Sequence, residues 1–338
     1  MRWSISLALA LSVAACRQTI VLDQHVDGGG GGADSGPGLC TGPPLAFAIE
    51  SPEVIVALDR SLGMGTRFGD STVLTASRDA IAQYATRYQK VIRFGYVEFP
   101  GSGNSCSPQP GCCASTVSPP IVNFAAFDLA LHACDQNQNP SPSSCSITGY
   151  QRPTTATLYG CSLVFSGQSN AGRRRYVLLV SNGRPDCGMN QNSGCTDAQN
   201  IADQLARNDV STIVVAPGQL DPDTADCLGG IAVYGGAQNR PYFYPASSPT
   251  ELTAEIGDIT RGMAKDACQL DVTTPIQNPD QAAVFWNDTQ IPRNRTGTDG
   301  WELTLNGFEI VLHGKWCERL VDEGPMALAL FASCNPQR

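Results

Sequence analysis

Apolar residues alternate along the chain between short continuous runs and longer stretches with helical spacing. The continuous runs, which predict strands, lie at 54–58, 92–99, 176–180 and 211–216. The stretches with helical spacing lie at 72–88, 124–134, 153–165, 197–207, 223–230 and 249–265. A strand that is apolar throughout is covered on both faces, as in a parallel sheet. The pattern therefore predicts an α/β fold with a doubly wound, mostly parallel sheet flanked by helices.

The last part of the chain, residues 268–338, has a different pattern. Its apolar or alternating runs predict strands at 282–286, 301–305, 308–312 and 326–332. The pair Asn306-Gly307 between two of these runs is a strong short-range signal for a hairpin. We expect a small β-rich module at 268–338 after an α/β domain at 45–267. Some of its three cysteines are expected to form disulfides: Cys268, Cys317 and Cys334.

The N-terminus predicts secretion and a lipid anchor. An apolar stretch over 5–15 is too short to span a bilayer as a mature helix but is typical of a signal peptide, which we place at 1–15. The stretch ends in Val13–Cys16, which resembles the lipobox of bacterial lipoproteins. The resemblance implies that Cys16 is lipidated and that the chain is attached to the cell envelope. Because Arg17 is not the aspartate that retains enteric lipoproteins at the inner membrane, we expect the outer membrane. The alternative is a plain secretory signal with a chance cysteine.

A tether follows the lipidation site. Residues 16–44 contain an unbroken glycine run at 28–32 and then small and polar residues. Such a segment cannot bury apolar area, so we expect it to be flexible.

Charge and length narrow the range of partners. The 338 residues are 42% hydrophobic and can bury a full core, with a smaller second domain. The net charge of -9 excludes a nucleic-acid partner, because such a site needs a basic face. The basic run at 173–175 leads into the predicted strand at 176 and is expected to be a solvated strand start.

Fourteen cysteines in a secreted chain indicate disulfides. Setting Cys16 aside leaves thirteen, so at least one is free or bonded to another molecule. The sequence does not fix the connectivity. Our first candidate is Cys187 with Cys195, which would close a short loop. Zinc binding is the alternative, but the cysteine spacings do not repeat the Cys-x-x-Cys pattern of zinc sites.

The first predicted strand runs directly into a polar turn, Asp59-Arg60-Ser61-Leu62-Gly63. Open α/β sheets bind ligands at the carboxyl ends of their strands. The Asp59 carboxylate and the Ser61 hydroxyl are oxygen ligands of the kind that Mg²⁺ prefers. The alternative is an ordinary turn that ends a strand.

This turn and the order of strands and helices over 45–267 resemble the von Willebrand factor type A family. The amino-acid sequences of the turns, including residues Gly183 to Cys187 after a later strand, are similar to those of lipoproteins of myxobacteria and related bacteria. In the family a metal ion is held by an aspartate and two serines of the first loop, a threonine of a second loop and an aspartate of a third. The metal completes its coordination with a carboxylate from a partner protein.

Two of the five ligand positions match, those of Asp59 and Ser61. The resemblance places Gly63 where the second serine stands, Arg152 where the threonine stands and Asn182 where the third-loop aspartate stands. We interpret this as a degenerate metal-ion-dependent adhesion site.

The threonine of the second loop is displaced rather than absent. Thr154 lies too late by the family's pattern, and Arg152 holds the metal-contacting position. An arginine side chain stays protonated, so Arg152 would repel a divalent ion and pair with Asp59. We therefore expect no cofactor, with Arg152 in place of the ion. Mg²⁺ or Mn²⁺ is the alternative if a shifted alignment restores Thr154 or Thr155 as a ligand.

Enzyme motifs are missing from the sequence. The three histidines, His25, His132 and His313, lie in none of the settings that activate a nucleophile or hold zinc. The favoured interpretation is a membrane-anchored, non-enzymatic protein-binding or adhesion module in which Arg152 receives an acidic side chain of a protein partner. The first alternative is a structural envelope lipoprotein with no ligand at the degenerate metal site. The second and less favoured alternative is an enzyme.

Overall fold

The computed structural model describes most of the chain after the predicted tether. The described residues are 19–20, 40, 43–101, 112, 116–121, 127, 131, 151–168, 172–188, 193–236, 243–304 and 306–334. The predicted signal peptide, Cys16 and nearly all of the predicted tether lie outside them. So does the helix predicted at 124–134, except for Phe127 and Leu131, which are helical and buried.

A six-stranded sheet forms the centre of the molecule, in the order β10-β9-β8-β3-β6-β7. Its strands are β3 (Glu53–Asp59), β6 (Arg93–Phe99), β7 (Ser118–Ile121), β8 (Arg175–Val180), β9 (Val210–Pro217) and β10 (Phe243–Ala246). All neighbours pair in parallel except β7, which is antiparallel to β6 at one edge. The predicted doubly wound, mostly parallel sheet is confirmed.

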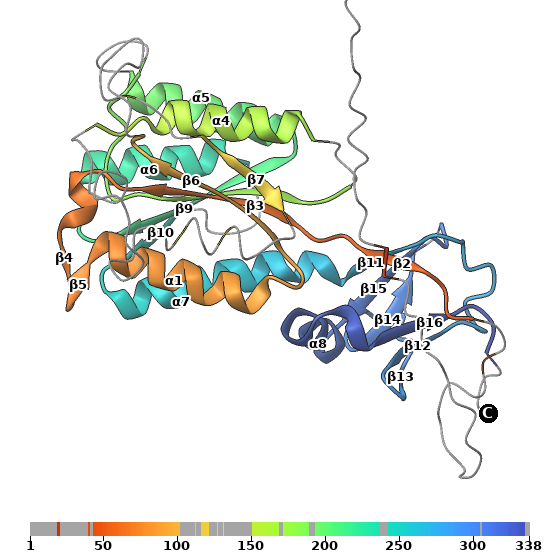
Figure 1. Cartoon of the computed structure of the whole chain (residues 1–338). Helices are drawn as coiled ribbons and strands as arrows, with labels where there is room; N and C mark the ends of the chain where they lie inside the picture. The colour runs from red at the N-terminus through yellow and green to blue at the C-terminus, as the bar shows by residue number, and fades with distance from the viewer. Residues whose placement is uncertain are drawn as a thin grey trace, which may run out of the picture.

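Helices cover both faces of this sheet (Figure 1). On one face lie α1 (Val73–Tyr88) and α7 (Pro249–Ala264); on the other lie α4 (Thr154–Ser166), α5 (Gly194–Arg207) and α6 (Pro222–Tyr234). Alternate residues of β3 point to opposite faces. Val54, Val56 and Leu58 therefore join the core under α1 and α7, while Ile55 and Ala57 join the core under α4, α5 and α6. This double burial explains the continuous apolar run at 54–58.

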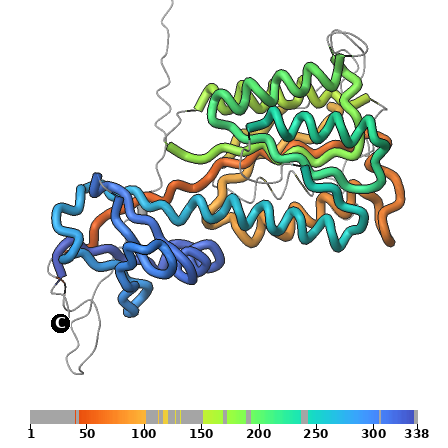
Figure 2. Tube along the Cα trace, turned by 180° about the vertical axis from the view of Figure 1, so that it is seen from behind, coloured from red at the N-terminus to blue at the C-terminus, as the bar shows by residue number. Residues whose placement is uncertain are grey.

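A β-rich module adjoins one end of these layers, as Figure 2 shows from behind. Its elements are β11 (Gln269–Val272), β12 (Ala283–Trp286), β13 (Thr289–Ile291), β14 (Gly300–Leu303), β15 (Glu309–His313), α8 (Lys315–Glu323) and β16 (Leu328–Phe331). The Asn306-Gly307 turn joins β14 to β15 as an antiparallel hairpin, as predicted, with Gly307 at a φ of 75°. The helix α8 was not predicted.

An N-terminal strand completes the module. β2 (Phe47–Ile49) pairs with β11, and β1 (Thr19–Ile20) pairs with β2. The range 45–267, which was expected to form the α/β domain, thus begins with β2, a strand that belongs to the sheet of the module. Cys40 is bonded to Cys334, which closes the module around this strand.

The module and the α/β layers share one hydrophobic core and a covalent bond. Cys268, which follows α7 in the short helix η4 (Lys265–Cys268), is bonded to Cys317 of α8. Ion pairs flank the bond, with Arg261 Nη2 at 2.9 Å from Glu318 Oε2. The last helix of the α/β layers is therefore fixed to the module.

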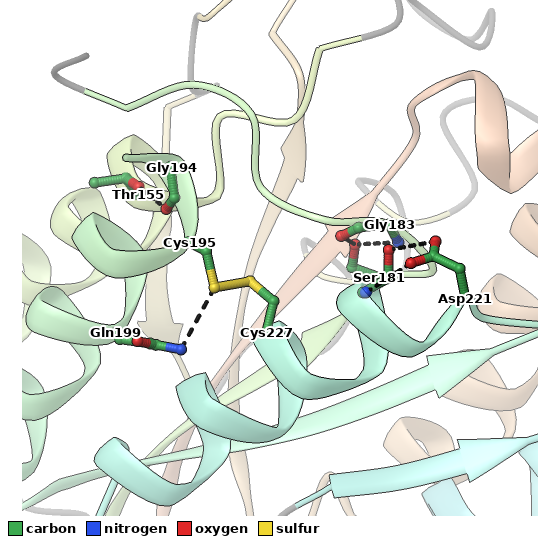
Figure 3. Close-up of a disulfide and its surroundings, with 9 residues drawn as sticks. Thr155, Ser181, Gly183, Gly194, Cys195, Gln199, Asp221 and Cys227 are labelled. Atoms are coloured by element: carbon green, nitrogen blue, oxygen red, sulfur yellow. Dashed lines mark hydrogen bonds between the residues drawn. A yellow bond between two sulfur atoms is a disulfide. The ribbon is translucent and has the colours of Figure 1, made fainter. Parts of the chain in front are cut away.

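The expected bond between Cys187 and Cys195 is wrong. Cys187 is bonded to Cys112 and Cys195 to Cys227. The physical reason is that Cys195 lies in the first turn of α5 and faces the neighbouring α6, which carries Cys227 (Figure 3). Closeness in sequence does not bring two cysteines together when a helix turns one of them toward another element.

Two further features belong to the described part of the chain. Cys161 is free and lies in the core, which fits the odd number of cysteines, and burial raises the pKa of its thiol to about 12. No helix there has the length and apolar character needed to cross a membrane.

Candidate functional site

The strand order reverses between β3 and β8. The chain passes from β3 to β6 and β7 on one side, and then from β8 to β9 and β10 on the other. Such a reversal opens a crevice at the carboxyl ends of the two central strands, where open α/β sheets bind ligands. Asp59 ends β3, and Ser181 and Asn182 follow β8 at the same edge. We call this the carboxyl edge.

Asp59 is fully buried at this edge and is held by hydrogen bonds. The Ser61 backbone N–H donates to its Oδ1 at 2.7 Å, and the Ser181 hydroxyl donates to its Oδ2 at 2.7 Å. Burial raises the pKa of Asp59, and these two bonds and the nearby Arg152 guanidinium oppose the rise only in part. The Ser181 hydroxyl also lies 3.4 Å from the backbone N and O of Gly183 (Figure 3).

Arg152 lies beside Asp59, as predicted. Its Nε is 3.4 Å from Asp59 Oδ2, and its side chain is 19% exposed. The backbone N–H of Arg152 donates to Asp186 Oδ1 at 2.5 Å, which fixes the start of α4 to the loop after β8. The positive charge is thus held at the buried carboxylate by both the side chain and the backbone.

Two glycines make room for the Arg152 guanidinium. A Cβ on Gly63 would lie 2.5 Å from Arg152 Nη2 and 2.8 Å from Asn182 Oδ1. A Cβ on Gly183 would overlap Arg152 Nε and Cζ. Because real Cβ atoms do not approach other atoms so closely, neither position tolerates a side chain while Arg152 is in place.

Several polar atoms of the site have no hydrogen-bond partner. They are Ser61 Oγ, Arg152 Nε, Thr154 Oγ1 and Asn182 Oδ1, all buried. The Asn182 amide does donate from Nδ2 to Gly63 O at 2.9 Å. Since most buried polar groups in proteins are paired, these atoms can form further hydrogen bonds with water or with another group.

The residues present do not complete a site for Mg²⁺ or Mn²⁺. The oxygens of Asp59, Ser61 and Asn182 are suitable ligands. However, the permanent charge of Arg152 lies within 3.4 Å of the carboxylate. A Cβ at position 63 would lie 2.5 Å from the same guanidinium, so a serine there would require Arg152 to move. Among the described residues no group of three or more His, Cys, Asp or Glu side chains is placed to hold a metal.

The structure brings together most of the residues that the sequence singled out. Asp59, Gly63, Arg152 and Asn182 are in contact, and Ser61 donates its N–H to Asp59. Thr154 is the first residue of α4 and is fully buried.

Three contributors were not predicted. They are Ser181, Gly183 and Asp186, and all lie in the loop after β8. The one available signal was their position at the end of a strand, because their roles depend on how Arg152 approaches.

Comparison with known proteins gives likeness in fold alone. No protein-family model and no curated protein matches the chain. Solved structures with a similar fold include the pilus adhesin SpaC from Lactobacillus rhamnosus GG in its open conformation, 13% identical with a TM-score of 0.49, over 78% of this chain and 36% of that one. Manganese-loaded TRAP protein from Plasmodium vivax is 12% identical, with a TM-score of 0.43, over 64% of this chain and 75% of that one. The SpRpn10 VWA domain is 14% identical, with a TM-score of 0.40, over 62% of this chain and 94% of that one. At these values the likeness assigns no family, ligand or activity to this chain.

Proposed function

We propose that this chain is a lipid-anchored, non-enzymatic protein-binding module of the cell envelope that uses the carboxyl edge of its central sheet. The observation that carries the proposal is the Arg152 guanidinium, which is held beside the buried Asp59 at the point where the strand order reverses. The site is a degenerate metal-ion-dependent adhesion site in which Arg152 substitutes for the ion. Its partner presents an acidic side chain.

The composition of the carboxyl edge supports binding over catalysis. Around Asp59 the described residues supply an arginine, hydroxyls and an amide. The described histidine, His313, lies in the module and contacts Glu302 at 2.9 Å. The described residues around Asp59 include no histidine, the side chain that most often activates a serine hydroxyl as general base.

The arrangement of the molecule suits an anchored binder. The N-terminal strand β2 lies in the module, whereas the hairpin of β4 (Arg67–Phe68) and β5 (Ser71–Thr72), which follows Asp59, lies at the opposite end (Figure 1). β3 runs from the module to the carboxyl edge. An anchor at Cys16 would therefore join the folded part through the N-terminal strand of the module and leave the carboxyl edge free to meet a partner.

Capture of partners from an envelope extract tests the proposal. We expect Arg152→Glu to remove the partners that the wild-type protein captures, because the substitution reverses the charge at the edge. Arg207→Glu is the matched control, since Arg207 is exposed in the last turn of α5 and pairs only with Asp203 of its own helix. An identical partner set for all three proteins would favour the structural envelope lipoprotein instead.

A further inference from the structure

The N-terminal strand β1 is paired with the module, although it lies inside the predicted tether. It runs antiparallel to β2, with Thr19 opposite Ala48, and adds an edge strand to the sheet of the module. Two residues separate β1 from the predicted lipidation site at Cys16. Three residue steps in a fully extended chain span at most about 11 Å. A lipid on Cys16 would therefore hold this sheet edge close to the bilayer.

The glycine run at 28–32 does not lengthen this connection. The segment that contains it begins at the end of β1 and ends at Cys40, which is bonded to Cys334 of the module. Both ends of the segment are thus attached to the folded chain. Its length has no influence on the distance between Cys16 and β1, so the two residues before β1 set the reach of the anchor.

The direction of β1 determines the side from which the chain arrives. Because β1 and β2 are antiparallel, the residues before Thr19 approach from the end at which β2 continues to Glu50. A Cβ on Gly172 would lie 2.9 Å from Glu50 Oε1, so the segment that leads into β8 lies against this end. Here β3 and β8 begin side by side, with Glu53 opposite Arg175 (Figure 1). We call this the amino edge; it is opposite to the carboxyl edge.

The basic run of the sequence lies at the amino edge. Arg173 and Arg175 are mostly buried and contact the Glu53 carboxylate at 3.4 and 3.1 Å. Arg174 is exposed, and its side chain forms no ion pair with a described residue. An anionic bilayer repels a chain with a net charge of -9 as a whole, but it attracts single basic residues close to its surface. Arg174 is available for such a contact next to the anchor.

We propose that β1 and the amino edge, with Arg174, form a surface that rests on an anionic phospholipid bilayer, held there by the short connection from Cys16. The inference rests on the lipid anchor of the proposed function and adds the orientation of the fold. The carboxyl edge lies at the other end of the same strands and points away from the bilayer.

Two insertions of equal length test the connection. Neutron reflectometry of the lipidated full chain, on a supported bilayer that contains phosphatidylglycerol, measures the gap between headgroups and folded protein. We expect about 15 Gly and Ser residues inserted between Gln18 and Thr19 to widen this gap by about 20 Å, the mean span of such a linker. The same residues inserted after Gly30 should leave it unchanged. Equal widening by the two insertions would overturn the proposal.

Loss of the β1 pairing should change the response to the second insertion. Thr19→Pro with Ile20→Pro removes the N–H donors of β1, so the whole segment before Cys40 becomes the connection. We expect the insertion after Gly30 to widen the gap in this background. His25→Pro with Val26→Pro is the matched control, since both residues lie outside β1, and the insertion should have no effect there. The same response in both backgrounds would show that β1 does not set the reach.

Paramagnetic headgroups test the orientation. Lipids that carry a Gd³⁺ chelate, in bilayer discs with phosphatidylglycerol, broaden the NMR signals of residues near the bilayer. We expect broadening at the amides of 172–175 and not at Gly63 or Gly183. Arg174→Glu should weaken it at least about twofold, and Arg67→Glu, an exposed control in β4, should not. Equal broadening at both edges would contradict the orientation.

The outcomes separate this inference from the binding role. A gap that both insertions widen equally, with Arg152-dependent capture of partners intact, rejects the inference and leaves the binding role standing. A gap that only the insertion before Thr19 widens, without such capture, supports the inference and rejects the binding role.

Discussion

Gly63, Arg152 and Asn182 depend on one another for space. Arg152 reaches Asp59 only because position 63 has no side chain, and Asn182 holds that position through its bond to Gly63 O. Reverting any one of them alone would disturb the other two. The three positions are therefore coupled through the space that the Arg152 side chain occupies.

A serine at position 63 tests this dependence. We expect Gly63→Ser to lower the free energy of unfolding by about 1–3 kcal/mol, as for other overpacked sites, because its Cβ collides with Arg152. The cost should fall when Arg152→Thr is added. Gly229→Ser is the control, since no atom lies near a Cβ at that position, and we expect it to change stability by less than about 0.5 kcal/mol. Urea unfolding of the wild type, Gly63→Ser, Arg152→Thr and the double variant gives the coupling energy, and a coupling of zero would show that the two positions do not compete for space.

The sequence predicts part of the site at this scale. The contact between Arg152 and Asp59 follows from the charges and from the resemblance, and the structure confirms it. The roles of Gly183 and Asp186 could not be predicted from the sequence. Gly183 leaves space for the Arg152 side chain and Asp186 accepts its backbone N–H, so both roles depend on where Arg152 lies in the fold. Such packing depends on how segments distant in the sequence meet in the fold, so it leaves no pattern in the local sequence.

Among the elements, those with a clear apolar run or helical spacing were predicted, including the short strands β12, β14, β15 and β16, whereas α8, β2 and β10 were not. β3, β8 and α7 match the predicted ranges within one or two residues. The nine-residue α8 buries residues at helical spacing, Trp316, Cys317, Leu320 and Val321, but was missed because its segment was expected to be β-rich. The strand β2 cannot reveal from its own sequence which sheet it joins. The pairing of strands and the packing of helices depend on residues that are far apart in the sequence. A local pattern therefore does not determine them.

The loop after β8 is fixed at Cys187 by its disulfide with Cys112. Asp186, the preceding residue, accepts the Arg152 N–H. We expect the double variant Cys112→Ser, Cys187→Ser to speed hydrogen exchange of the Arg152 amide, because Asp186 would no longer be held. NMR exchange measurements check this.

The other disulfide near this loop provides a control. Removal of the Cys195–Cys227 bond, by serine at both positions, should leave the Arg152 amide protected, since that bond joins α5 to α6 and does not hold Asp186. Equal acceleration in both double variants would point to general loosening of the fold.

Three carboxylates meet where β2 ends beside β11 and β15. Glu50 is hydrogen-bonded to Asp271 and lies near Glu309, and its pKa is raised from 4.5 to about 7, chiefly by burial and then by Asp271. The folded chain thus holds a proton that the unfolded chain releases at lower pH. The stabilising contribution is full below pH 4.5 and is lost as the pH rises toward 7.

Glu50→Gln should remove this pH dependence. We expect the stability of the wild-type protein, relative to the variant, to fall between pH 4.5 and about 7, the range set by the two pKa values. Urea unfolding at several pH values measures the difference. A constant difference across this range would show that Glu50 does not titrate there.

In the whole molecule, the carboxyl edge and the N-terminal strand β2 lie at opposite ends (Figure 1). The module takes in the N-terminal strand, and β3 carries the chain from there to Asp59 (Figure 1). We expect Cys16→Ser to move the protein from the detergent-rich phase to the aqueous phase in Triton X-114 partitioning, because the acyl chains supply the membrane affinity. Arg17→Ser, which leaves the cysteine in place, should stay in the detergent phase. Aqueous partitioning of the wild type would reject the lipid anchor.

The bond between Cys40 and Cys334 joins residues 294 positions apart and encloses nearly the whole folded chain in a covalent ring. A protease that cuts one peptide bond inside the ring opens it but releases no fragment. The binding edge would stay connected to the N-terminal segment through the second arm of the ring. A single cleavage inside the ring would therefore leave the two pieces of the chain covalently joined, whereas the same cut in a chain without this bond would separate them.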